Sequence, residues 1–95
     1  MKTYWGDRTI DGIQVTVDGA PLPTGEAQHR YSANGFEWGY EGPEAAQLAY
    51  ALLADHLADH SRAAALHAGF MRDVVANLAN SWELTSADID AALAG

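Results

Sequence analysis

The spacing of apolar residues changes at Gly42-Pro43, and this change constrains the fold more than any other feature of the sequence. Before it, apolar and polar residues alternate, as in the segment IQVTVDG that begins at Ile13; a period of two is typical of a half-buried strand. After it, apolar residues recur every three to four positions from Ala45 to Leu57, which is the period of an amphipathic helix. Proline also suits the first position of a helix. We therefore expect strands before this point and helices after it.

Residues 1–42 predict a small antiparallel sheet of about three strands. Asp18-Gly19 marks one tight turn, and Asn34-Gly35 suits a two-residue type I′ turn because both residues adopt positive φ at low cost. The second turn would form a hairpin in which Arg30 lies diagonal to Glu37 and pairs with it. The aromatic residues of this hairpin are expected to form the sheet side of the core: Tyr31, Phe36, Trp38 and Tyr40.

The remaining residues predict three helices, over residues 43–58, 61–79 and 86–94. Ser61 is a candidate N-cap of the second helix. Thr85, with Asp88 three residues later, resembles a capping box for the third. Gly69 lies in the middle of the second helix, where glycine costs about 1 kcal/mol relative to alanine. We expect close packing at Gly69 to explain its presence, and we expect Trp82 to fill the gap beside the last helix.

Together these patterns predict a single α+β domain over residues 1–95, with a sheet region (1–42) and a helical region (43–95). Two helices and the short third one would cover one face of the sheet. The other face would be exposed, which allows a homodimer. A chain of 95 residues builds one core and has little apolar surface to spare for a deep substrate cavity.

Several kinds of chemistry are excluded or disfavoured by the sequence. The absence of cysteine excludes disulfides, thiolate zinc sites and cysteine nucleophiles. No serine lies in a Gly-x-Ser-x-Gly elbow, and no glycine-rich loop is followed by the lysine of a phosphate-binding loop. No stretch approaches the ~18 apolar residues of a membrane span, and the segment MKTYWGDRT lacks a signal-peptide pattern. We expect a cytoplasmic protein without membrane contact, catalytic activity or cofactor.

His56 and His60 are the strongest candidates for a metal site. Histidines four residues apart share a helix face and hold zinc when a third ligand is present. The alternative is a solvated helix end, where histidine suits the negative end of the helix dipole. The second interpretation is favoured, so no metal site is assigned; His29 and His67 are interpreted as structural residues.

The charge balance disfavours nucleic acid as a direct partner. There are 13 acidic residues against five lysines and arginines, and the formal net charge is −8, whereas phosphate binding requires the opposite sign. The same charge is compatible with a host protein that has a basic surface, including one that normally holds nucleic acid. The alternative is an acidic surface that only confers solubility. The candidate partner-binding residues are Glu37, Glu41, Glu44, Asp55 and Asp59.

The segment GFEWGYEGPEAAQLAYALL, with YWGDR and VTVDGAPL before it and FMRDVVANL and WELTSADI after it, resembles a family of small uncharacterised domains of bacteria, phages and plasmids. The resemblance covers nearly the whole chain and implies an α+β fold and a mobile-element setting. It implies no activity.

These observations favour a non-catalytic binding protein of a phage or mobile element that docks on a host protein through an acidic surface. Such a protein would act as a nucleic-acid mimic, for example as an anti-CRISPR inhibitor. The alternative is a self-associating structural or regulatory module, and a histidine-based metal-binding protein is the least favoured hypothesis.

Overall fold

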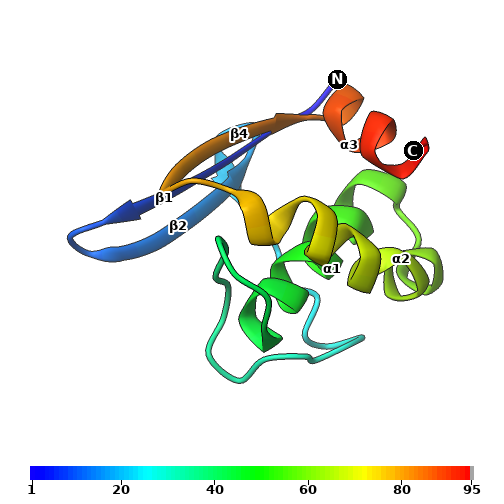
Figure 1. Cartoon of the computed structure of the whole chain (residues 1–95), viewed down its shortest axis with the longest axis horizontal. Helices are drawn as coiled ribbons and strands as arrows, with labels where there is room; N and C mark the ends of the chain where they lie inside the picture. The colour runs from blue at the N-terminus through cyan, green and yellow to red at the C-terminus, as the bar shows by residue number, and fades with distance from the viewer. Residues whose placement is uncertain (95) are drawn as a thin grey trace.

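The computed structural model describes residues 1–94, which form one antiparallel sheet and three α-helices (Figure 1). The strands are β1 (Thr3–Thr9), β2 (Gly12–Val17), β3 (Ala20–Pro21) and β4 (Ser81–Thr85). The helices are α1 (Pro43–Leu57), α2 (His60–Asp73) and α3 (Ser86–Ala94), and a short 3-10 helix, η1 (Val75–Asn77), follows α2. The strand order is β3-β2-β1-β4. The predicted α+β fold is confirmed, but the sheet has four strands instead of about three.

The additional strand, β4, comes from the part of the chain that was predicted to be helical. The helix predicted over residues 61–79 ends at Asp73, and Trp82 lies in a strand beside β1 instead of filling a gap next to a helix. Trp82 is buried whereas Ser81 and Glu83 are exposed, so the segment SWELT alternates with the period of a half-buried strand. The sequence contains this alternation, but it extends over only five residues, and the strand was not predicted.

The sheet is covered on one face only. Successive side chains of β1 point to opposite faces, so Tyr4 is fully buried whereas Trp5 is 57% exposed. The helices and residues 22–42 lie on the Tyr4 side, and none of the described helices covers the Trp5 side (Figure 1). The hairpin of β1 and β2 extends beyond the helices, with Ile10 exposed at its tip.

Residues 22–42 form a long irregular loop instead of the predicted hairpin at Asn34-Gly35. The loop is held by Gln47, a fully buried side chain of α1. Its carboxamide makes four hydrogen bonds to loop backbone: it accepts from the N–H groups of Tyr31 (2.6 Å) and Ser32 (3.2 Å) and donates to the carbonyls of Thr24 (2.8 Å) and His29 (3.1 Å). Since these backbone groups are paired with a side chain, they need no strand partner.

The aromatic residues expected in the core differ in burial. Trp38 is fully buried and meets Trp82 edge to face, with ring centroids 5.6 Å apart. Tyr31 and Phe36 are partly buried against the core. Tyr40 lies at the surface, 46% exposed, because the loop does not continue as the strand that would have directed it inward.

The helix boundaries follow from capping. α1 begins at Pro43, as expected. The N-cap of α2 lies two residues earlier than predicted, because Asp59 and not Ser61 caps the helix and accepts the N–H of Arg62 at 3.0 Å. The capping box of α3 is confirmed, since Asp88 N–H donates to the Thr85 hydroxyl (3.1 Å) and Thr85 N–H donates to the Asp88 carboxylate (2.9 Å).

Gly69 of α2 has no close packing of the kind expected. A methyl group at this position would meet only the Arg72 side chain, at an ordinary contact distance of 3.6 Å. The packing explanation for this glycine is therefore wrong.

Candidate functional site

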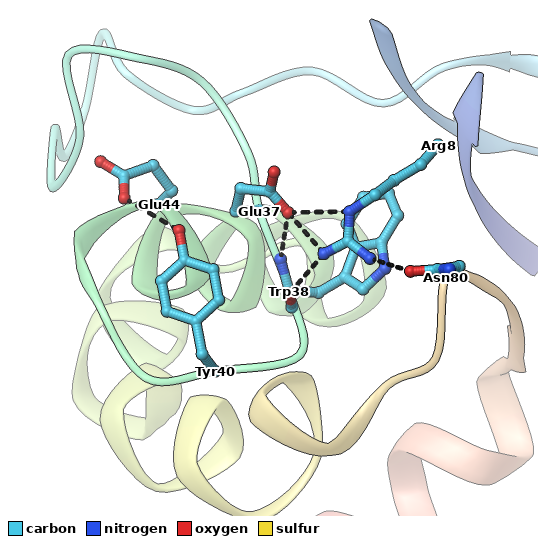
Figure 2. A network of polar contacts seen from close by, with 6 residues as sticks. All are labelled: Arg8, Glu37, Trp38, Tyr40, Glu44 and Asn80. Carbon is cyan, nitrogen blue, oxygen red and sulfur yellow. Dashed lines mark hydrogen bonds and ion pairs between the residues drawn. The ribbon is translucent and has the colours of Figure 1, made fainter. Parts of the chain in front are cut away.

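Arg8 joins three separate segments of the chain (Figure 2). Its guanidinium donates to the Glu37 carboxylate at 2.7 Å, to the Trp38 carbonyl at 2.6 Å and to Asn80 Oδ1 at 2.6 Å. It also lies over the Trp38 ring, 4.7 Å from the centroid. Glu37 therefore pairs with Arg8 of β1. The hairpin had predicted a pair between Glu37 and Arg30, and that prediction is wrong. The contacts connect β1, the 22–42 loop and the segment before β4.

Arg8→Lys is expected to lower the free energy of unfolding by about 1–2 kcal/mol, because an ammonium group cannot make the forked contacts to Glu37, Trp38 and Asn80 at once. The matched control, Arg30→Lys, changes an exposed arginine and should leave the free energy of unfolding within about 0.5 kcal/mol of wild type. Chemical denaturation measures both. Equal effects of the two variants would contradict a structural role for the guanidinium of Arg8.

Three of the five predicted acidic residues gather around Tyr40, and we call this surface the acidic rim: Glu37, Tyr40, Glu41 and Glu44. Glu44, in the first turn of α1, accepts hydrogen bonds from the hydroxyls of Tyr40 (3.4 Å) and Ser32 (3.3 Å). Partial burial, and then the charges of Glu44 and Glu37, raise the pKa of Tyr40, so its hydroxyl remains a donor. Glu41 is exposed, and its carboxylate makes no hydrogen bond or ion pair within residues 1–94.

Asp55 and Asp59 do not belong to this surface. Asp55 lies near the other end of α1, roughly 16 Å along the helix axis from Glu44, and Asp59 follows the end of this helix. Asp55 accepts hydrogen bonds from Lys2 Nζ (3.0 Å) and the Tyr4 hydroxyl (2.7 Å), and Asp59 caps α2. Both carboxylates therefore have structural roles, and the structure does not bring the five predicted residues together.

Tyr4→Phe is expected to reduce the loss of stability at alkaline pH. Burial, the hydrogen bond to Asp55 and the nearby charges of Asp55 and Asp18 raise the pKa of Tyr4 above its ordinary value of 10.0. Because the folded state retains this proton more strongly than the unfolded state, the contribution is present below pH 10.0 and is lost as the pH rises further. Unfolding measured across this range should show a shallower decline for Tyr4→Phe. An identical decline would contradict this assignment.

His56 and His60 lie in different helices and point to different partners. His56 Nε2 is 2.6 Å from an Asp90 carboxylate oxygen of α3, and His60 Nδ1 contacts the Tyr50 hydroxyl. The i, i+4 geometry expected for a single helix is interrupted at Ala58, which is left-handed (φ 54°). Within residues 1–94, no three His, Asp or Glu side chains lie close enough together to hold a metal ion.

A shallow hollow of about 590 Å³ lies between the 22–42 loop and the C-terminal part of α1. The polar groups in its lining include Asp55 and His60. Asp55 is already paired with Lys2 and Tyr4, and His60 with Tyr50. These two groups are therefore engaged in holding the fold together.

A second surface lies on the uncovered side of the sheet, and we call it the Trp5 face: Trp5, Asp7, Ser81 and Glu83. The register of β1 and β4 places Trp5 directly opposite Glu83 and Asp7 directly opposite Ser81. The Ser81 hydroxyl donates to the Asp7 carboxylate at 2.6 Å. These residues, with Gly6 and Trp82, line a hollow of about 320 Å³. Because β4 was not predicted, Glu83 was not expected to lie beside Trp5.

A comparison with protein-family models matches residues 4–95 to a family of unknown function, DUF6166. The chain belongs to this family. Comparisons with curated proteins and with solved structures give no match.

The DUF6166 match includes Arg8, the acidic rim and the Trp5 face, since only the first three residues of the chain lie outside it. The family is of unknown function, so its match assigns no activity to this chain. Among the described residues, none of the helices has the length and apolar character needed to cross a membrane.

Proposed function

We propose that this protein is a non-catalytic binding domain that docks on a basic surface of a partner protein through the acidic rim. The observation that carries the proposal is the exposed Tyr40 ring among three glutamates, of which Glu41 is not engaged within residues 1–94. An exposed tyrosine supplies contact area of the kind that dominates binding energy at interfaces. The surrounding carboxylates supply the long-range attraction that guides a basic partner to it.

The carboxylates of the rim are held in place before a partner arrives. Glu37 is paired with Arg8, and Glu44 accepts hydrogen bonds from Tyr40 and Ser32. The rim is also fixed to the core, because the Glu37 N–H donates to the Glu44 carbonyl at 3.3 Å. Groups that are already ordered lose less conformational entropy on binding.

A more specific version of this proposal is an inhibitor from a phage or mobile element that mimics nucleic acid on a host protein. The net charge of −8 supports it, because a protein surface that binds phosphates also attracts carboxylates. In this version the partner's own nucleic acid competes with the protein for one site. A complex that binds both at the same time would contradict mimicry while leaving the docking proposal intact.

The test is the affinity of a partner captured from a lysate of the cells that carry this protein and then purified. Affinity should fall as salt is added, because salt screens exposed charges. Glu41→Arg should weaken binding by about tenfold or more, since it places a like charge against the basic partner. The control, Asp11→Asn, neutralises an exposed carboxylate at the β1–β2 turn and should change the affinity less than about twofold. An affinity insensitive to both salt and Glu41→Arg would contradict the proposal.

Self-association through the helices is supported less well. The apolar face of α1 that would join two copies is buried in the core, where Leu48, Leu52 and Leu53 are fully covered. On α2, Leu66 is only 36% exposed. Light scattering at increasing protein concentration tests this alternative, and a constant molar mass is the result expected for a monomer.

A further inference from the structure

We propose that the Trp5 face is a second binding site, separate from the acidic rim, and that it accepts an arginine side chain of a partner protein. The site consists of an exposed indole, two carboxylates and a hollow between β1 and β4. Glu83 is the direct cross-strand neighbour of Trp5, which places their Cβ atoms about 4.5–5.5 Å apart. Asp7 lies two residues along β1 on the same face.

The protein itself shows how these groups bind a guanidinium. On the inner side of the sheet, Arg8 lies over the Trp38 ring and pairs with the Glu37 carboxylate. The Trp5 face presents the same two chemical groups, an indole and a carboxylate, on the outer side. A partner arginine that stacks on Trp5 and pairs with Glu83 would reproduce the environment of Arg8.

Charge complementarity selects a basic occupant. The outward-facing positions of β1, β2 and β4 contain no lysine or arginine: Thr3, Trp5, Asp7, Thr9, Gln14, Thr16, Ser81, Glu83 and Thr85. Asp7 and Glu83 therefore have no cation on their own face. A second copy of the chain would bring the same two carboxylates against them, and like charges in contact are repulsive, so a homodimer through this face is disfavoured.

Arginine fits this site better than lysine. The guanidinium is planar, so one face stacks on the indole while its edge donates two hydrogen bonds to a carboxylate. The Ser81 hydroxyl donates to Asp7 and limits the rotation of that carboxylate. An ammonium group has neither the flat face nor the paired donors.

The intact protein is titrated with a short peptide of alternating serine and arginine, and the binding affinity is measured by calorimetry. Trp5→Thr, which keeps a strand-forming residue, should weaken binding by about fivefold through loss of the cation–π contact. Glu83→Gln should weaken it by about two- to fivefold. The matched control is Asp11→Asn, which removes the same charge at the exposed β1–β2 turn and should leave the affinity within about twofold. The serine-lysine peptide should bind more weakly than the serine-arginine peptide.

Three results would overturn the proposal. Equal weakening by Asp11→Asn and Glu83→Gln would show that the peptide responds only to net charge. Unchanged affinity of Trp5→Thr, with a melting curve like that of wild type, would show that the indole takes no part. Concentration-dependent dimerisation that is lost in Trp5→Thr would assign the face to a second copy of this chain. Because the acidic rim is tested by its own partner and by Glu41→Arg, either proposal fails independently of the other.

Discussion

Gln47→Leu is expected to lower the free energy of unfolding by about 3 kcal/mol or more. The substitution keeps the approximate size of a fully buried side chain but removes four hydrogen bonds to the backbone of the 22–42 loop. Ser32 is nearly fully buried, so its N–H would lose the Gln47 acceptor without gaining water. A buried polar group left without a partner costs about 1–3 kcal/mol. Chemical denaturation gives the magnitude, and faster amide hydrogen exchange at Tyr31 and Ser32 would show that the loop is released.

Two further variants isolate the role of the carboxamide. Gln28→Leu makes the same change at an exposed position of the loop and should alter stability by about 0.5 kcal/mol or less. Gln47→Glu keeps the acceptor for the two N–H groups but, when ionised, places a carboxylate against the carbonyls of Thr24 and His29. Gln47→Glu should therefore lower the free energy of unfolding more at neutral pH than at acidic pH. A Gln47→Leu variant as stable as Gln28→Leu would contradict this account of the loop.

Gly6→Ala is expected to lower the free energy of unfolding by about 2–3 kcal/mol, although alanine is normally tolerated at least as well as glycine in a strand. The ring of Trp82 lies against Gly6 so closely that an added methyl group would overlap it. Trp82 is itself buried against Trp38, so it has little room to move. Thermal and chemical denaturation should both report the loss.

The comparison with Gly69→Ala makes this prediction specific. Gly69 is a helical glycine without close neighbours, so alanine there should stabilise the protein by up to about 1 kcal/mol. In a Trp82→Leu background the smaller side chain leaves space for the methyl group, and Gly6→Ala should cost much less than in wild type. Equal costs in the two backgrounds would show that the indole is not the obstacle.

Local patterns predicted much of the fold. The change of period at Gly42-Pro43 located the start of α1, and Thr85 and Asp88 located the start of α3, because these signals act within one helical turn. The part of the 22–42 loop around Asn34-Gly35 was mispredicted as a hairpin. Asn34-Gly35 is a strong local turn signal, but the side chain of Gln47 provides the backbone with partners that no local pattern reveals.

The candidate surfaces were less predictable because they depend on which distant residues meet. The acidic residues around Tyr40 are close in sequence and were three of the five candidates, but Asp55 and Asp59 lie elsewhere. Glu83 and Trp5 are brought together only by the pairing of β1 with β4, and β4 was not predicted. The pairing of Glu37 with Arg8 also connects segments far apart in the chain.

Both proposed sites combine an exposed aromatic ring with carboxylates, and a single titration examines them together. Amide chemical shifts are recorded by NMR while the protein is titrated with the serine-arginine peptide. We expect shift changes concentrated at the amides of residues 37–44, 5–7 and 81–83, with little change at the amides of the exposed Asp11 and Asp73. Changes spread evenly over all acidic residues, including Asp11 and Asp73, would contradict this expectation, because the peptide would then respond to net charge and not to the acidic rim and the Trp5 face.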